Sequence, residues 1–548
     1  MSRRVRWMLV LGVVLSLSVI PIAVGGSASA AHTSASAGRA LAARTASASS
    51  AALQQHGVRP IPHQHSTAAP NAIVAPRAAD QRVVGATAPL LANFNGVSSR
   101  DSAVTNFGAE FEPPDQGLCS GNGYVVEMVN SAYTVYKPDG TVVTGPYNVN
   151  GPFDEGLSEF TSDPRCHYDA ATHTWYATVL FINADSTQSR VDLAVNTSGD
   201  PTKAWTTYRI DTTDIGGATG PKHPGCPCLG DQPTLGIDAA NVYITTNEFS
   251  LLGPEFNGAQ IYAIPRSDLV PGPAGPTGPT ATPAHVVHFD NLNVGGAVAA
   301  SVQPALTTGS APAEYFLSSL DPNGTFDQRI GVWAMTNVAG IAKGVKPTLS
   351  SYVMPSEAYG PPPGAEQKGA SSLLNAGDDR MQQVQYIGGH IWGALDTSVT
   401  IPNDAAARAG AAWFKVTPTL SKGTVTAATA QQGYVAAAGN YVLYPSIQSA
   451  PDGKTVMAFS LSSATRFPSA AYAVLNAGAT AFGPLTVAAA GTGSYEPKAT
   501  RWGDYSWAVL DPSGKGVWAA TEYIPPATSQ TADGRRNWGT RVFEVATP

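Results

Sequence analysis

The sequence predicts an all-β fold, a seven-bladed β-propeller of four-stranded blades. Three observations lead to this prediction. A polar phrase followed by an aromatic strand, first seen as Asp163-Pro164-Arg165 with Thr174-Trp175-Tyr176, recurs along the chain. Short apolar or alternating segments are separated by turn signals such as Pro138-Asp139-Gly140, and we find almost no amphipathic helix. Only 13% of the 548 residues are charged, while 55 are Gly and 43 are Pro, which is typical of a turn-rich β protein.

The repeated phrase divides the chain into seven units. Successive units begin roughly 50 to 75 residues apart, which leaves room for about four strands of ordinary length in each. Four-stranded sheets repeated radially form a propeller, and closure into a ring limits the number of exposed sheet edges. Tandem β-sandwich domains are the rival architecture, but they do not explain why seven starts share one motif. The units begin near Asp115, Asp163, Asp231, Gln303, Asp379, Tyr444 and Trp502.

The two ends of the domain are predicted to share a blade. The last unit supplies only about three strands up to residue 548, whereas residues 89–94 form a strand with no partner in their own unit. We therefore expect the N-terminal strand to complete the last blade and to close the ring.

The residues before the propeller read as a leader and a spacer. Residues 1–30 have a positive start, an apolar run and an Ala28-Ser29-Ala30 cleavage site, which is the pattern of a secretory signal peptide. An uncleaved N-terminal anchor is the alternative. Residues 31–82 are rich in Ala and Ser and predict a disordered spacer. The propeller domain is then 83–548, and we expect a secreted, extracellular protein without a membrane span after signal cleavage.

The four cysteines are expected to form disulfides, because an oxidising exterior favours pairing. Three connectivities are open. Only one residue lies between Cys226 and Cys228, so we expect each of them to reach Cys119 or Cys166 rather than each other. A zinc site made of cysteines is the alternative, although no Cys-x-x-Cys pair is present.

The aromatic half of each phrase has a structural interpretation. In the second strand of several units an aromatic residue precedes small ones, and in a propeller such rings fill the wedge between blades. A platform for stacking sugars is the functional alternative. The residues concerned are Trp175, Tyr243, Trp333, Trp392 and Trp518.

The polar half is the candidate ligand site. Because the innermost strands of a propeller start near its axis, equivalent residues of several blades converge on one funnel. Converging guanidinium groups bind carboxylates or sulfates through charge-assisted hydrogen bonds. Two alternatives stay open: each Asp caps a turn and pairs with a neighbouring Arg, or a ring of Asp holds calcium. The funnel candidates are Arg165, Arg380, Arg501, Asp115, Asp163, Asp231, Asp379 and Asp504.

Residues 85–548 resemble a secreted bacterial β-propeller family related to the sialidase-like, BNR-repeat proteins. The resemblance rests on Pro113-Pro114-Asp115-Gln116, Val126-Glu127-Met128-Val129-Asn130, Asp231-Gln232-Pro233-Thr234, Arg501-Trp502-Gly503-Asp504-Tyr505 and Asn537-Trp538-Gly539-Thr540-Arg541.

That resemblance implies a sugar-binding propeller and, for true sialidases, an arginine triad, a Tyr/Glu nucleophile pair, an acid/base Asp and Asp-box turns. The stretch from Ser449 to Val456 matches an Asp box in part, with Val456 where the box has Trp. The Arg-Ile-Pro signature that opens sialidase catalytic domains is absent, and the three arginines do not match the triad residue by residue.

The remaining sequence features narrow the function. The formal net charge is −7 and no basic patch is concentrated enough to follow a phosphate backbone, so we expect no nucleic-acid partner. No serine-hydrolase elbow, zinc-protease helix, phosphate loop or dinucleotide fingerprint is present. We expect the funnel to bind a glycan, a peptide or a surface partner. We expect no metal centre and no cofactor, except for calcium in the alternative in which a ring of Asp residues holds it. A sialidase-like glycoside hydrolase acting on an anionic sugar and a purely structural surface module are the alternatives.

Overall fold

The computed structural model describes residues 74–85, 90–157, 159–216, 222–269, 280–281, 283, 285–320, 322, 324–496, 501–526 and 536–547. The chain divides into two units, Met1–Thr45 and Ala46–Pro548, and every described residue belongs to the second. The predicted signal peptide, 1–30, and residues 31–73 of the predicted spacer lie outside the described residues.

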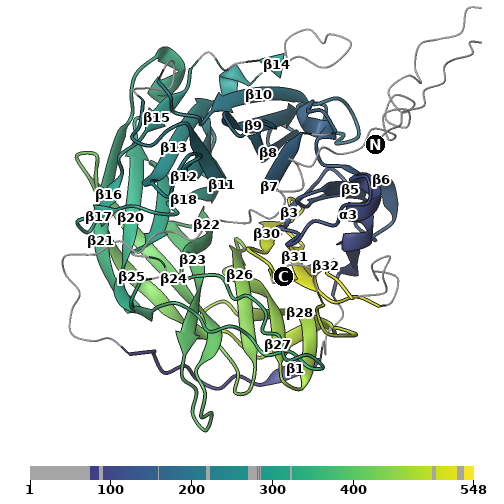
Figure 1. Ribbon diagram of the computed structural model, residues 1–548. Helices are drawn as coiled ribbons and strands as arrows, with labels where there is room; N and C mark the ends of the chain where they lie inside the picture. The colour runs from purple at the N-terminus through teal and green to yellow at the C-terminus, as the bar shows by residue number, and fades with distance from the viewer. Residues whose placement is uncertain are drawn as a thin grey trace, which may run out of the picture. The chain divides into compact units, whose positions relative to one another are not determined.

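The described fold is all-β and consists mainly of antiparallel meanders, most of them made of consecutive strands (Figure 1). The first meander comprises β3 (Gly117–Gly121), β4 (Tyr124–Met128), β5 (Ala132–Tyr136) and β6 (Val142–Asn148). The second comprises β7 (Phe160–Asp169), β8 (Thr174–Ile182), β9 (Ser189–Asn196) and β10 (Thr206–Asp211), with β14 (Thr280–Ala281) parallel to β10. The third comprises β11 (Cys228–Ile237), β12 (Asn241–Ser250), β13 (Phe256–Pro265) and β15 (Val287–Phe289).

Further meanders follow in the same order along the chain. The fourth comprises β18 (Gln303–Thr308), β19 (Glu314–Ser319), β20 (Asp327–Thr336) and β21 (Thr348–Tyr359). The fifth comprises β22 (Met381–Ile387), β23 (His390–Val399), β24 (Arg408–Ser421) and β25 (Thr424–Val435). The sixth comprises β26 (Tyr441–Ser449), β27 (Thr455–Ser463), β28 (Arg466–Leu475) and β29 (Leu485–Ala489), with β1 (Val83–Gly85) parallel to β29. The last comprises β30 (Trp507–Leu510), β31 (Gly516–Tyr523) and β32 (Gly539–Ala546).

Little else in the described residues is regular. One α-helix, α3 (Ser99–Thr105), begins with a capping box in which the Ser98 and Asp101 side chains bond each other's backbone N–H groups. The remaining elements are three 3₁₀ turns and one small hairpin: η1 (Gly151–Phe153), η2 (Arg266–Asp268), η3 (Val338–Lys343), and β16 (Asn293–Val294) with β17 (Ala297–Val298). No helix in the described part of the chain has the length and apolar character needed to cross a membrane.

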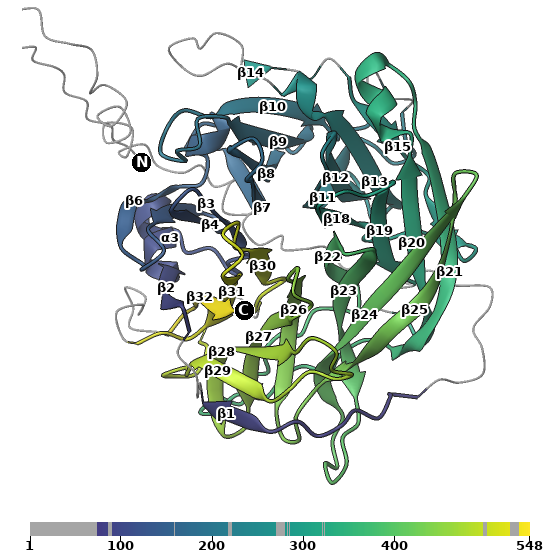
Figure 2. The same ribbon diagram turned by 180° about the vertical axis from the view of Figure 1, so that it is seen from behind.

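The meanders lie against one another through their first strands. These contacts run in chain order through β3, β7, β11, β18, β22, β26 and β30, and β30 in turn contacts β3. Figure 2 shows the same strands on the inner side of their sheets. Since β8 and β12 are buried along their whole length, their sheets are covered on both faces. The aromatic residues Trp175, Tyr243 and Trp518 are buried as expected, and the Tyr243 ring packs edge-on against Phe316 of the following meander.

The expected pairing of the N-terminal strand with the last unit is confirmed. The strand β2 (Ala92–Ser98) pairs antiparallel with β32, so that the last sheet has four strands in the order β2, β32, β31, β30. Phe94 of β2 contacts Tyr136 of the first meander, with ring centroids 5.1 Å apart, and Trp518 of the last, at 6.3 Å. Residues 76–82, the end of the predicted spacer, also contact the sheets, since Ala78 N donates to Thr400 O over 2.9 Å.

A shared β-bulge shapes the start of several first strands, which we call the strand heads. The pairing register shifts between Ser162 and Arg165, between Asp231 and Thr234, and between Leu443 and Ser446. One residue at each of these heads takes a left-handed backbone conformation: Asp163 (φ 57°), Gln232 (φ 50°) and Tyr444 (φ 54°). Each is followed by proline, which lacks an N–H group and is tolerated where the bulge interrupts the ladder. The recurring Pro of the sequence motif therefore marks a bulge.

All four cysteines form disulfides, but the predicted connectivity is wrong. Cys119 of β3 pairs with Cys166 of β7, and Cys226 pairs with Cys228. A sequence separation of two predicts no bridge, yet the chain turns tightly at Pro227 and brings the two Cα atoms to 4.4 Å, which lies within the range that a disulfide bridges. The Cys119 and Cys166 Cα atoms are 5.3 Å apart and tie the first meander to the second.

Candidate functional site

The structure brings the predicted polar residues together at the strand heads. Asp115 lies within electrostatic reach of Asp163 and Arg165 of the second meander and of Arg501 of the last. Arg380 interacts in the same way with Asp231 and with Tyr444, and Tyr444 interacts in turn with Arg501 and Asp115. The heads of β3, β7, β11, β22, β26 and β30 therefore contribute to one connected polar region, which we call the axial cluster.

The three arginines of the axial cluster do not present open guanidinium groups side by side. Arg165 is buried, its guanidinium lies 3.2 Å above the Tyr505 ring centroid and 4.9 Å from that of Trp507, and burial lowers its pKa. Arg380 forms a two-pronged ion pair with Asp378, at 2.7 and 2.6 Å, and donates to Gln232 Oε1 over 2.6 Å.

Arg501 is ion-paired with Asp504. The arginines are thus held by carboxylates, an amide and aromatic rings, an arrangement that differs from an exposed triad gripping one carboxylate.

The acidic members of the cluster are buried as well. Burial, followed by the charge of Asp163, raises the pKa of Asp115, although Asn130 Nδ2 donates to its carboxylate over 2.7 Å. Burial also raises the pKa of Asp396 of β23, a carboxyl that lies within electrostatic reach of Asp379. Since buried carboxylates without a full set of partners are costly, these groups hold protons more tightly than exposed ones.

Three residues that the sequence reading missed hold neighbouring heads in place. Asn130, Asn247 and Asp396 each accept a 2.8 Å hydrogen bond from the backbone N–H of the next head, at Asp163, Ser301 and Tyr444 respectively. All three stand at or just beyond the second strand of a meander. These three residues could be found in the sequence by aligning the second strands of the units as well as their heads.

Several polar atoms of the heads and of the second strands beside them have no hydrogen-bond partner among the described residues. Natural proteins satisfy most buried polar groups, so such atoms call for water or a ligand. Gln116 is fully buried and neither atom of its side-chain amide is bonded. The other atoms are Asp115 Oδ1, Arg165 Nε, Asp396 Oδ2, Ser446 Oγ and Glu522 Oε1.

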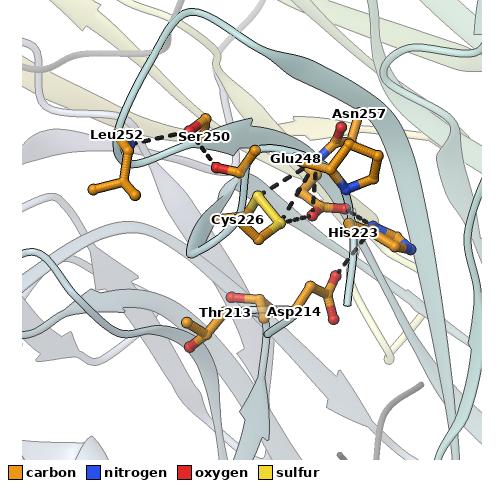
Figure 3. The surroundings of a disulfide bond; sticks show 12 residues. Thr213, Asp214, His223, Cys226, Glu248, Ser250, Leu252 and Asn257 are labelled. Carbon is orange, nitrogen blue, oxygen red and sulfur yellow. Dashed lines mark hydrogen bonds and ion pairs between the residues drawn. A yellow bond between two sulfur atoms is a disulfide. The ribbon is translucent and has the colours of Figure 1, made fainter. Parts of the chain in front are cut away.

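A second polar cluster, which the sequence reading did not predict, lies beside the Cys226–Cys228 disulfide (Figure 3). His223 is buried, and its Nδ1 lies 2.6 Å from Glu248 Oε2 and 3.7 Å from Asp214 Oδ2. On the other side of the ring, Nε2 lies 2.8 Å from Asp290 Oδ2. Glu248 stands near the end of β12, and Asp214 and His223 lie between β10 and β11. We call these four residues the histidine cluster.

The disulfide and an asparagine close one side of the histidine cluster. Glu248 Oε1 lies 2.9 Å from Cys226 Sγ and accepts a 3.2 Å hydrogen bond from Asn257 Nδ2. Burial, and then the charge of Glu248, raises the pKa of Asp214 to about 7. Burial also raises the pKa of Glu248. Three carboxyl groups thus surround one imidazole; Asp214 and Glu248 are buried, and Asp290 is partly exposed.

Cavities also lie elsewhere in the described part of the chain, among them the following two. One, of about 40 Å³, lies at the far ends of the first strands, between Ser120, His167, Thr308 and Gln448. Burial lowers the pKa of His167 to about 4. The other, of about 260 Å³, lies between the fifth and sixth meanders and is lined by Trp392, whose ring contacts Lys415 Nζ at 5.0 Å. The first has room for water only.

The sequence matches no protein-family model and no curated protein. Among solved structures it is similar to the phage phi92 endosialidase, with 9% identity, 76% of this chain and 71% of that chain covered, and a TM-score of 0.37.

Two further solved structures are similar. A Penicillium chrysogenum α-L-arabinanase complexed with arabinobiose matches with 9% identity, coverage of 83% and 99%, and a TM-score of 0.35. A Trypanosoma rangeli sialidase in complex with sialic acid matches with 11% identity, coverage of 76% and 57%, and a TM-score of 0.34. The expected resemblance to sialidase-like proteins is therefore met only as a distant structural likeness, on which no argument about this chain rests.

Proposed function

We propose that this chain is a secreted, seven-bladed β-propeller that binds a glycan at the axial cluster. The blades in this proposal are the seven meanders, and the contact of β30 with β3, together with the β2–β32 pair, supports a closed ring. Export rests on the signal peptide predicted for residues 1–30, and the two disulfides are compatible with an oxidising compartment.

The main support for this binding site is the set of polar atoms at the strand heads that have no hydrogen-bond partner among the described residues. Gln116, Asp115 and Arg165 leave donors and acceptors unbonded, and the Tyr505 and Trp507 rings stand beside them. A sugar offers hydroxyl groups that both donate and accept, and a carbon face that contacts aromatic rings. Since the arginines are already held by the protein, we favour binding over hydrolysis.

Gln116→Met tests this proposal because it removes both unbonded amide atoms at nearly constant volume. We expect the variant to lose at least about tenfold in glycan affinity on an array that includes sialylated, uronic-acid and sulfated glycans. Its folding stability should stay equal or rise by about 1 kcal/mol, because an unsatisfied buried amide disfavours the folded state. Binding would be measured on the array, and stability by urea unfolding.

Gln383→Met is the matched control. Gln383 is also a buried glutamine of a first strand, but both of its amide atoms are bonded to the Ala508 backbone. We expect this variant to lose about 1–3 kcal/mol of stability and to keep its glycan binding. An array without any bound glycan, or equal binding by wild type and Gln116→Met, would contradict the proposal. Turnover of fluorogenic glycosides by the wild type would instead support the hydrolase alternative.

A further inference from the structure

The histidine cluster carries an inference that is independent of the axial cluster. We propose that Asp214, His223 and Glu248 bind a divalent transition-metal ion, for which Zn²⁺ is the probe. Ligand atoms of these three buried residues lie within 4.8 Å of one another. One imidazole with two carboxylates is a donor set suited to Zn²⁺ and its first-row neighbours, whereas Ca²⁺ and Mg²⁺ prefer oxygen alone.

The second partner of the imidazole supports this assignment. Metal-bound histidines usually donate the other ring N–H to a carboxylate, which fixes the tautomer and the ring orientation. Asp290 Oδ2, 2.8 Å from His223 Nε2, is placed to accept that N–H group. Nδ1 forms a 2.6 Å hydrogen bond with Glu248 Oε2 and lies 3.7 Å from Asp214 Oδ2, so a metal ion that displaced the shared proton would meet one ligand atom from each of the three residues.

A carboxylate oxygen of Asp214 that has no hydrogen-bond partner in the described part of the chain also supports the proposed metal site. Asp214 is 2% exposed, and its Oδ2 has no hydrogen-bond partner in the described part of the chain. In Figure 3 this carboxylate is directed toward His223 and is joined to it by the long ion pair. This buried carboxylate oxygen, 3.7 Å from an imidazole nitrogen, is placed as a metal ligand is.

The distances between the ligand atoms permit tetrahedral coordination of an ion after a small movement of the side chains. Ligand atoms about 2.1 Å from one tetrahedral Zn²⁺ stand roughly 3.4 Å apart. The Nδ1 to Asp214 separation, 3.7 Å, is already near this value. The Nδ1 to Glu248 separation, 2.6 Å, has to open by less than about 1 Å. Three protein ligands leave one position of the tetrahedron for water.

The neighbouring disulfide decides which atoms coordinate. Cys226 and Cys228 form a second group around Glu248, but sulfur atoms joined in a disulfide are not thiolate ligands. The Cys226–Cys228 bridge instead lies against Glu248 Oε1, on the side away from His223. The proposed site is therefore one of nitrogen and oxygen ligands in the oxidised protein, and it differs from a cysteine zinc site.

The test uses the oxidised, disulfide-bonded protein after removal of metals with a chelator. We expect calorimetry to show one Zn²⁺ bound per chain, and Zn²⁺ to raise the thermal unfolding midpoint. Substituted Co²⁺ should give visible d–d bands without sulfur-to-cobalt charge transfer. His223→Gln and Asp214→Asn should abolish both effects. Asp290→Asn should weaken Zn²⁺ binding about 10- to 100-fold, as loss of a supporting carboxylate does at other sites.

His285→Gln is the matched control, because His285 Nδ1 pairs with Asp268 at 2.9 Å and belongs to neither group of clustered ligands. This variant should bind Zn²⁺ like the wild type. The proposal is overturned if the oxidised protein binds no Zn²⁺, if His285→Gln matches His223→Gln, or if binding requires reduction and Co²⁺ then shows sulfur charge transfer. If His223→Gln does not fold, Asp290→Asn provides the test, because Asp290 is partly exposed. An unchanged Zn²⁺ affinity in Asp290→Asn would contradict the proposed site.

Discussion

At the scale of single residues, buried charge at the strand heads and the neighbouring strands is the dominant feature. The repeat places Asp115, Arg165 and Arg380 near the heads of their strands, and in the structure each interacts with residues of neighbouring heads; a ligand at these residues stays a prediction. The sequence did not predict the ion pair between Asp378 and Arg380 or the stacking of Arg165 on the Tyr505 ring, because such pairings depend on loop conformations that no periodic pattern specifies.

Glu127 of β4 yields a prediction about pH at this scale. Burial raises its pKa from an ordinary value of 4.5 to about 7, against the opposing hydrogen bonds from Thr540, the Val97 N–H and Tyr136. The folded protein therefore binds this proton more tightly than the unfolded chain. The resulting stabilisation is fully present below pH 4.5 and is lost as the pH rises to about 7. Its full size is on the order of 3 kcal/mol.

Glu127→Gln should remove this dependence, because the amide is neutral at every pH. We expect the difference in unfolding free energy between the variant and the wild type to grow in favour of the variant from pH 5 to pH 8, measured by urea unfolding. Asp185→Asn, at an exposed position, should follow the wild type across that range. Parallel stability curves for wild type and Glu127→Gln would show that the carboxyl is not protonated in the folded state.

At the scale of elements, the sequence predicted strands well and their connections less well. The turn signals and the aromatic second strands located the meanders, and the lone strand near residues 89–94 led to the β2–β32 pair. The disulfide connectivity failed because spacing along the chain says little about a turn as tight as that at Pro227. The histidine cluster was missed because Asp214, His223, Glu248 and Asp290 come from separate segments without a metal-binding motif.

The two disulfides should differ in their effect on stability. Cys119 and Cys166 are 47 residues apart, whereas Cys226 and Cys228 are two apart. Cross-linking restricts the unfolded chain more when it closes a longer loop, so replacing Cys119 and Cys166 by Ala should cost about 2–4 kcal/mol. Replacing Cys226 and Cys228 by Ala should cost less. Denaturant unfolding with a chelator present measures both, and equal losses would contradict the loop argument.

At the scale of the whole described domain, stability depends on how the first and last sheets are joined. In the described structure β30 contacts β3, and β2 carries the N-terminal segment into the sheet formed by the C-terminal strands. Phe94 packs between Tyr136 of the first meander and Trp518 of the last, so one side chain contacts both sides of this junction. Sequence reading anticipated the β2 pairing by counting strands, but not the residue that fills the junction, because ring packing depends on the angle between sheets.

Phe94→Ala therefore tests whether this junction stabilises the whole domain. Removing a large aromatic side chain from a packed site costs about 3–5 kcal/mol when the site is fully buried, and we expect about 2–3 kcal/mol here because Phe94 is only partly buried. Leu91→Ala, three residues earlier and 52% exposed, should change stability by less than about 0.5 kcal/mol. Because the first and last sheets meet at this point, the loss should appear as a lower midpoint of the main cooperative transition, followed by far-ultraviolet circular dichroism and by tryptophan fluorescence. If Phe94→Ala unfolds like Leu91→Ala, the junction contributes little, and the domain is held together by its other inter-sheet contacts alone.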